Sequence, residues 1–281
     1  MAMTARAARR IWAWLRASSA ALALAAAPVA AAPERVVSMN LCTDQLALML
    51  AAPGQLLSVS ALSQDPRSSA MAEAARRLPA NHGRAEEVFL MRPDLVLAGS
   101  YTTPATRSML SRLGIRVETL PPAASLDEVR SNLRTVGRLL GREVEAEAMV
   151  AEFDADLAAL APAEGERPDA ALYQAQGYAS GPETLAGEIL AAAGFDNAAA
   201  AAGVSGGAFL PLEVLVTLAP DLVVSGGRQP GASRAEEVLD HPALRALHRS
   251  EAPMGSDWVC GTPHVLAAVE RLSGERRALA H

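Results

Sequence analysis

The sequence contains no lysine, so all 25 of its basic residues are arginines, and it has only four phenylalanines, three tyrosines and three tryptophans. Without lysine the chain cannot form a Schiff base on its own side chain or complete a phosphate-binding loop that ends in Gly-Lys. A formal net charge of -6 argues against nucleic-acid binding, which requires a basic face. With 51% hydrophobic residues over 281 positions, the chain is long enough for one large or two smaller folded domains.

The first 31 residues have the features of a cleaved secretory signal peptide. Four arginines occur among the first 16 residues, an apolar run follows at 17–27, and alanines precede Pro33. The run is shorter than the ~20 apolar residues that a membrane-spanning helix needs. We predict export to the periplasm with cleavage after Ala31, and whether Arg9 and Arg10 form a twin-arginine signal stays open. Residues 32–281 carry 21 arginines against 31 acidic residues, a net charge of -10.

One half of the remaining chain repeats a pattern of the other half. The segment 86–99 reappears at 213–226, and Pro-Asp-Leu-Val occurs at 93–96 and again at 220–223, 127 residues later. In each copy a short amphipathic helix stops at the proline, and a short apolar run typical of a buried parallel strand follows. A single repeat at so long a spacing predicts two similar lobes rather than a solenoid.

Further segments around the repeats alternate between strand-like and helix-like patterns. Strands are predicted at 35–39, 116–119, 170–173 and 222–225, and helices at 43–52, 104–113 and 182–193. Such alternation predicts a doubly wound parallel sheet in each lobe. The fold class is therefore α/β, with two doubly wound α/β lobes bridged by a long helix and a ligand cleft between the lobes; the lobes are expected at 32–124 and 161–281.

The expected bridge is the segment 125–160. Ser125 and Glu128 form a capping box, and apolar residues recur at approximately helical spacing as far as Phe153. This pattern predicts one long helix or two nearly collinear ones, with a possible bend at Gly137 and Gly141. At about 1.5 Å per residue such a helix is long enough to reach from one lobe to the other. A helical bridge of this kind limits the motion of the lobes.

Four segments carry a resemblance to a known family: RVVSMNLCTDQL from Arg35, RPDLVLAG from Arg92, GREVEAEAMVAEF from Gly141, and Ser-Asp-Trp from Ser256. Together they resemble the substrate-binding proteins of ABC importers for iron-siderophores, haem and cobalamin, over essentially all of 32–281. The Ser-Asp-Trp segment looks most like the cobalamin-binding branch. The resemblance implies a monomer without enzymatic activity or a cofactor of its own. It would bind a corrinoid, a ferric siderophore or haem and deliver it to membrane permease subunits.

In this family one acidic residue on each lobe docks into arginine pockets of the permease. By position these residues are Glu86 and Glu213, each seven residues before the proline of its repeat. Carboxylate–arginine contacts at two points would give both affinity and orientation. The alternative is that each glutamate only complements the dipole of the short helix that it begins. The symmetric placement of the two residues favours docking.

The ligand of such a fold is expected at the loops that follow the carboxyl ends of the strands. The expected ligand contacts come from these loops: Met39, Asn40, Leu41, Cys42, His82, Arg84, Tyr101, Thr102, Gln176, Tyr178, Asp257 and Trp258. Trp258 is the only tryptophan beyond the leader, so stacking on a macrocycle competes with core packing as its role. Arg84 is a candidate partner for an anionic ligand, or a solvated surface charge.

Cys42 and Cys260 leave three alternatives open. They are inert buried thiols, or they contact a metal or a bound chelate together with His82, or they form a disulfide that would hold the cleft closed. The second alternative corresponds to a rival function, a periplasmic metallochaperone or a chelate-processing enzyme that uses Cys42, Cys260 and His82. No His-Glu-x-x-His or Gly-x-Gly-x-x-Gly motif is present. We therefore predict a binding protein rather than an enzyme.

Overall fold

The computed structural model describes residues 31–162, 165–226, 234–247, 250 and 253–279. The predicted signal peptide therefore lies, except for Ala31, outside the described residues. Ala32–His281 forms one compact unit, separate from Met1–Ala31. Within the described ranges, no helix is both long and apolar enough to cross a membrane.

The first sheet confirms the doubly wound prediction. It contains β1 (Val36–Ser38), β2 (Leu56–Ser60), β3 (Ala80–Asn81), β4 (Leu95–Gly99) and β5 (Arg116–Leu120), in the order β3-β2-β1-β4-β5 with every pair parallel. The connecting helices are α1 (Leu41–Leu50), α2 (Ala72–Ala75), α3 (Ala85–Leu90) and α4 (Pro104–Arg112). Strand order reverses between β1 and β4, so a crevice is expected at their carboxyl ends.

The second sheet is mixed, which corrects the prediction of a parallel sheet in this half. Its strands are β6 (Asp169–Tyr173), β7 (Tyr178–Ser180), β8 (Asp196–Asn197), β9 (Gly207–Phe209) and β10 (Leu222–Val224). Strands β8 and β10 run parallel to β6, whereas β7 is antiparallel to β6 and to β9. The chain reverses after β6 because Gln176 (φ 59°) and Gly177 (φ 73°) adopt left-handed conformations. Such a short connection joins antiparallel strands only.

The helices of this half are α7 (Leu185–Ala192), α8 (Leu212–Leu218), α9 (Pro242–Arg245) and α10 (Val265–Leu279). Both copies of the sequence repeat adopt the same local structure. Arg92 (φ 49°) and Ala219 (φ 45°) are left-handed and follow the ends of α3 and α8, directly before the two prolines. The aspartate that follows each proline accepts a hydrogen bond from a backbone N–H at the start of the neighbouring strand. Asp94 accepts from the N–H of Arg35, and Asp221 accepts from the N–H of Asp169. The repeat is therefore a device that aligns two parallel strands in each half.

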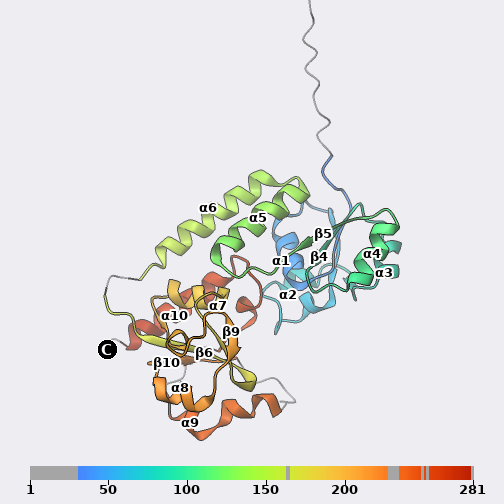
Figure 1. The fold of residues 1–281 in the computed structure, drawn as a ribbon. Helices are drawn as coiled ribbons and strands as arrows, with labels where there is room; N and C mark the ends of the chain where they lie inside the picture. The colour runs from blue at the N-terminus through green and yellow to red at the C-terminus, as the bar shows by residue number, and fades with distance from the viewer. Residues whose placement is uncertain (1–30, 163–164, 227–233, 248–249, 251–252, 280–281) are drawn as a thin grey trace, which may run out of the picture. The chain divides into compact units, whose positions relative to one another are not determined.

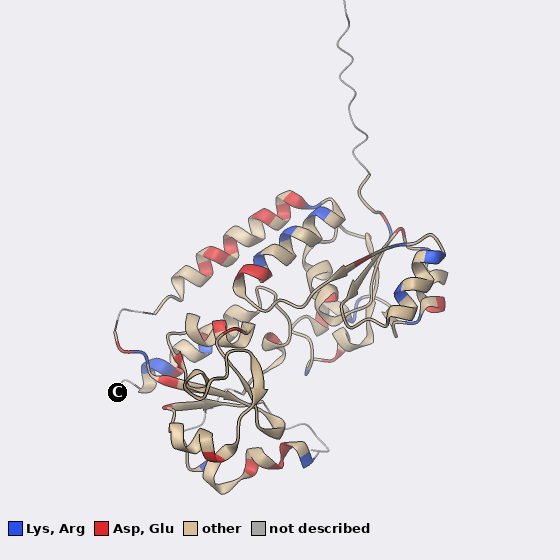
Figure 2. Cartoon of the chain, viewed as in Figure 1, with Lys and Arg blue, Asp and Glu red and all other residues tan. Residues whose placement is uncertain are grey.

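The bridge is a helical hairpin, not the long or collinear helix that the apolar spacing predicts. Helices α5 (Leu126–Leu140) and α6 (Glu143–Ala159) lie side by side (Figure 1). Arg134 pairs with Glu147 at 2.8 Å and Arg130 with Asp154 at 2.6 Å, an antiparallel pattern that also appears as opposed charges on the two helices (Figure 2). The reversal occurs at Gly141, whose φ of 69° ends α5 in a left-handed conformation.

A single apolar core connects the two sheets and the hairpin. The same buried cluster includes Leu97 of the first sheet, Leu133 of α5, Phe153 of α6, Leu172 of the second sheet and Leu272 of α10. Separating the sheets would expose this shared surface, which opposes large movements of one half against the other.

We expect Gly137→Ala to destabilise the protein, although Gly→Ala normally stabilises a helix interior by about 1 kcal/mol. A Cβ on Gly137 would lie 2.4 Å from Cβ of Ala146 across the hairpin. Overpacking of this kind costs roughly 1–3 kcal/mol in the free energy of unfolding, measured by urea denaturation. Ser131→Ala on the exposed side of α5 is the control. A more stable Gly137→Ala variant would contradict the close packing of α5 on α6.

Candidate functional site

Two hollows lie where the strands of both sheets end. The larger, about 660 Å³, is lined by Pro66 and Arg67 beyond β2, by Gln174 and Ala175 after β6, and by residues 253–257 and Val259. The smaller, about 330 Å³, is lined by residues 40–43 after β1, 99–101 after β4 and 120–123 after β5, together with Val259 and Gly261. The smaller hollow thus occupies the crevice at which the strand order reverses.

Two other hollows lie elsewhere. One of about 540 Å³ is lined by Asp169 and Asp221, at the amino ends of β6 and β10, and one of about 510 Å³ lies beside α6 and α7. Because ligands of open α/β sheets bind at the carboxyl ends of the strands, we take the first two hollows as the candidate site.

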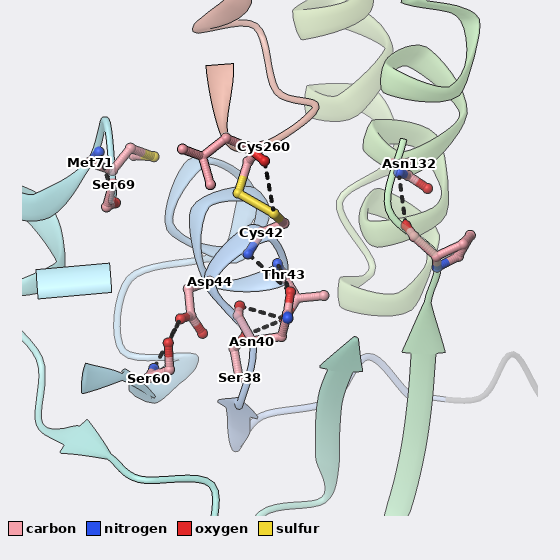
Figure 3. The surroundings of a disulfide bond; sticks show 12 residues. Ser38, Asn40, Cys42, Thr43, Asp44, Ser60, Ser69, Met71, Asn132 and Cys260 are labelled. Carbon is pink, nitrogen blue, oxygen red and sulfur yellow. Dashed lines mark hydrogen bonds between the residues drawn. A yellow bond between two sulfur atoms is a disulfide. The ribbon is translucent and has the colours of Figure 1, made fainter. Parts of the chain in front are cut away.

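A disulfide between Cys42 and Cys260 joins the first half of the chain to the second within this site (Figure 3). Cys42 lies in the first turn of α1, and Cys260 follows a short 3₁₀ turn at Ser256–Trp258. The neighbouring Val259, 51% exposed, lines both hollows. Val259, next to the disulfide, is therefore a lining residue that the two hollows share, and we call Cys42, Val259 and Cys260 the disulfide ridge.

The disulfide excludes two of the three alternatives that the sequence left open for the cysteines. Sulfur atoms bonded to each other offer no thiolate, so neither inert thiols nor a thiolate metal site with His82 describes this protein. Among the described residues, no group of three or more His, Cys, Asp or Glu side chains is placed to hold a metal ion. The rival function that depended on free Cys42 and Cys260 loses its chemical basis.

The start of α1 is fixed by side-chain hydrogen bonds. The Oδ1 atom of Asn40 accepts from the backbone N–H groups of Cys42 (3.0 Å) and Thr43 (3.4 Å) and so caps the helix. Gly99 of β4 allows this arrangement, because a Cβ there would lie 2.6 Å from the Asn40 side chain. Asn40 therefore positions Cys42 and, through it, the disulfide ridge.

Asp44 lies beneath this helix start with its carboxylate fully buried. It accepts hydrogen bonds from the backbone N–H of Ser60 at 3.0 Å and from the Ser60 hydroxyl (Figure 3). Burial raises the pKa of the Asp44 carboxyl to about 6, although hydrogen bonds from Ser38 and Ser60 partly oppose that shift. The contact ties α1 to the end of β2, which leads to Arg67 in the larger hollow.

Five of the residues predicted to contact a ligand lie at the two hollows. Asn40, Leu41, Cys42 and Tyr101 line the smaller one, and Tyr101 is 88% exposed. Asp257 lines the larger one. Thr102 lines neither hollow. Its hydroxyl accepts a hydrogen bond from the Gly99 N–H at 3.1 Å and so holds the loop after β4.

The other predicted contacts do not line either hollow, as far as the described residues go. Met39 is buried in a core cluster with Val88, and Trp258 packs against the main core, which favours the packing interpretation of this tryptophan. The remaining four residues are exposed at the surface: His82, Arg84, Gln176 and Tyr178. His82 donates its backbone N–H to Glu87 at 2.8 Å, at the start of α3.

Of the charged side chains of the larger hollow, the sequence indicated Asp257 but not Arg67, Glu236 or Arg271. Arg67 forms three hydrogen bonds of 2.6–3.1 Å to the Asp65 carboxylate, and Arg271 forms one of 2.5 Å to Asp257. Glu236 adds a further carboxylate to the lining. Both arginines are therefore already neutralised by the protein itself, and only the Asp-x-Arg spacing of the first pair was a sequence signal.

Glu86 and Glu213 occupy equivalent exposed positions outside the hollows. Each lies in the first turn of the helix that precedes its Pro-Asp repeat, Glu86 on α3 and Glu213 on α8. The structure thus preserves the symmetry of the repeat at both carboxylates.

The buried Asp44 predicts a pH-dependent contribution to stability. Because its folded-state pKa is raised from 3.8 to about 6, its stabilising contribution is complete below pH 3.8 and is lost as the pH rises through 6. Asp44→Asn should gain up to about 3 kcal/mol on the wild type between pH 4 and pH 7, measured by urea denaturation at each pH. A stability difference that stays constant over this range would contradict a buried, titrating Asp44.

Comparisons with known proteins agree with this fold. The periplasmic heme-binding protein RhuT from Roseiflexus sp. RS-1 superposes with a TM-score of 0.71 at 22% identity, over 88% of this chain and 99% of that one. The periplasmic vitamin B12 binding protein BtuF of Vibrio cholerae gives 0.63 at 18% identity, over 88% and 98%. At these identities the likeness concerns the fold alone.

Sequence comparison is more specific. A cobalamin-binding protein of Halobacterium salinarum is 31% identical over 245 residues, which cover 85% of this chain and 66% of the relative. The chain thus spans slightly less than two thirds of the length of that relative. A family model described as periplasmic binding protein matches residues 36–248. This match covers all the described strands of both sheets and the whole hairpin, and the chain belongs to the periplasmic binding protein family.

Proposed function

We propose that this protein captures a metal chelate in the periplasm and delivers it to the permease of an inner-membrane ABC importer. The observation that carries the proposal is the pair of hollows at the carboxyl ends of both sheets, at a reversal of strand order. Binding is non-covalent, with Asn40, Leu41, Tyr101 and Asp257 as contacts. The leader directs export and is removed after Ala31.

The first candidate for the ligand is a corrinoid, with ferric siderophore and haem as alternatives. In the larger hollow Arg67 and Arg271 are each paired with an aspartate, so neither is free for a ligand carboxylate. A corrinoid carries uncharged amides around its rim, which hydrogen-bond to such ion pairs without displacing them. Haem carries two propionates and ferric catecholates are anionic, so among the described residues of this lining both would face Glu236 without an unpaired arginine. The relative from Halobacterium salinarum, a cobalamin-binding protein, supports the same choice.

Titration of the periplasmic protein with cyanocobalamin, haemin and a ferric catecholate tests the proposed function. We expect cyanocobalamin to bind at least about tenfold more tightly than either anionic chelate, a difference of 1.4 kcal/mol or more. Isothermal calorimetry gives the affinities, and native mass spectrometry with the visible spectrum identifies any ligand that co-purifies. Tighter binding of haemin or the catecholate would overturn the choice of a corrinoid, and the absence of binding to all three would overturn chelate capture.

We further propose that Glu86 and Glu213 dock onto arginines of the permease. Their exposed, equivalent positions on α3 and α8 present one carboxylate from each half of the chain. The double variant Glu86→Arg with Glu213→Arg should reduce ligand uptake at least about tenfold, because like charges would then meet at both contacts. Ligand affinity of the isolated protein should stay unchanged, since neither residue lines a hollow.

Glu143→Arg is the matched control, because Glu143 is also exposed in the first turn of a helix, α6. Uptake by this variant measures the effect of losing only the favourable helix-dipole interaction. Uptake by the double variant that equals uptake by Glu143→Arg would leave the glutamates with a helix-dipole role only.

A further inference from the structure

The turn 174–177, which follows β6, connects the wall of the larger hollow to the start of α8. Its first residues, Gln174 and Ala175, line that hollow. At its other end the carbonyl oxygen of Gly177 accepts a hydrogen bond of 2.8 Å from the backbone N–H of Leu210. Leu210 lies two residues before the first residue of α8. The hollow and the helix that carries Glu213 are therefore joined through this turn.

A buried hydroxyl fixes the junction. Tyr173, the last residue of β6, is 1% exposed, and its hydroxyl donates to the carbonyl oxygen of Leu210 at 3.2 Å. Only glycine fits beside this contact, because a Cβ on Gly177 would lie 3.0 Å from the Tyr173 oxygen and 3.1 Å from that of Leu210. Burial and, second to it, the negative charge of Glu213 raise the pKa of Tyr173. The carboxylate proposed for docking thus acts on this buried hydroxyl.

The backbone of the turn is strained. Gln176 has φ 59° and ψ 14°, a left-handed conformation that glycine adopts freely but that costs a glutamine free energy. Its side chain is exposed, so packing around that side chain does not impose the conformation. A strained conformation persists only where the surrounding structure enforces it. The two hydrogen bonds that Leu210 makes with Gly177 and Tyr173 supply such contacts.

The equivalent place in the first half of the chain is occupied by Met39. Counted from the residue whose N–H bonds to the repeat aspartate, Met39 and Tyr173 each come four residues later. Met39 is buried in a core cluster with Val88, and a thioether has no hydroxyl to donate. A connection through a buried tyrosine hydroxyl therefore belongs to α8 and not to α3.

We propose that the turn 174–177 is a two-state element that releases the ligand when the permease binds. While α8 is in place, Leu210 and Tyr173 hold the turn in its strained form, and its first two residues complete the wall of the larger hollow. When the permease binds Glu213 and draws α8 outward, these hydrogen bonds break, the turn relaxes, and that part of the wall withdraws from the ligand. This inference rests on the proposed docking of Glu213 and specifies the step by which docking lowers the ligand affinity.

Native-state hydrogen exchange at the Leu210 amide measures how often the turn opens, because this N–H bonds to Gly177. Tyr173→Phe removes only the hydroxyl and should speed the exchange about fivefold. Gln176→Gly removes the strain and should slow it about fivefold, and the double variant should exchange at close to the wild-type rate. Gln176→Ala removes the side chain but keeps the conformational cost, so the difference between glycine and alanine isolates the strain.

Ser58→Ala is the matched control for Tyr173→Phe, because the buried Ser58 hydroxyl also donates to a backbone carbonyl, that of Pro79 beside the first sheet. It should leave exchange at Leu210 within about twofold of the wild type, since it lowers global stability without touching the turn. Equal acceleration by Ser58→Ala and Tyr173→Phe, or equal rates for glycine and alanine at position 176, would overturn the two-state turn.

Two further measurements connect the turn to the ligand and to the permease. Saturating cyanocobalamin should slow exchange at Leu210 at least about fivefold, because the ligand binds the held form better. Gln176→Gly should bind cyanocobalamin at least as tightly as the wild type by calorimetry, yet its uptake should fall at least about fivefold, since docking then works against a more stable turn. Exchange that cyanocobalamin does not slow, or full uptake by Gln176→Gly, would overturn release through the turn while leaving ligand binding intact. Failure of the wild type to bind cyanocobalamin would instead overturn the proposed corrinoid function, and the release role with it.

Discussion

The Cys42–Cys260 disulfide is the constraint on which the geometry of the site depends. It joins residues 218 positions apart, one at the start of α1 and one before α10. In the chain-entropy model, closing a loop of this length destabilises the unfolded chain by about 5 kcal/mol. The bond also acts together with the shared apolar core, which already connects both sheets through the α5–α6 hairpin. A cleft held in both ways is largely preformed, so less ordering free energy is lost when a ligand binds.

The position of the disulfide depends in turn on two polar side chains, the partly buried Asn40 and the fully buried Asp44. The Asn40 cap fixes the first turn of α1, and the hydrogen bonds from Ser60 to Asp44 fix the same helix from below. Burying the Asp44 carboxylate costs free energy at neutral pH, as its raised pKa of about 6 shows. That cost is consistent with a site in which accurate placement of α1 matters more than maximal stability.

The sequence predicted those parts of the fold that local patterns determine. The Pro-Asp repeat and the strands around it were found because a helix, a proline and a buried strand each leave a local signature. The hairpin was missed because the apolar spacing continues through Gly141, and glycine permits a left-handed turn without requiring one. In the site, Asn40 and Tyr101 were found because they directly follow strands. Arg271 lies on α10 and reaches the larger hollow only through tertiary packing, and the pairing of Cys42 with Cys260 is likewise a long-range contact.

The absence of lysine gives the charges of this protein a particular role. Every cation is a planar guanidinium, and guanidinium groups form multiple hydrogen bonds with carboxylates, as Arg67 does with Asp65. Because acidic residues outnumber arginines, the arginines at the larger hollow are paired within the protein. In the proposed function the cleft therefore selects its ligand by shape and by neutral hydrogen bonds. In the same proposal the exposed carboxylates of Glu86 on α3 and Glu213 on α8 recognise the permease, so ligand selection and docking use different physical interactions.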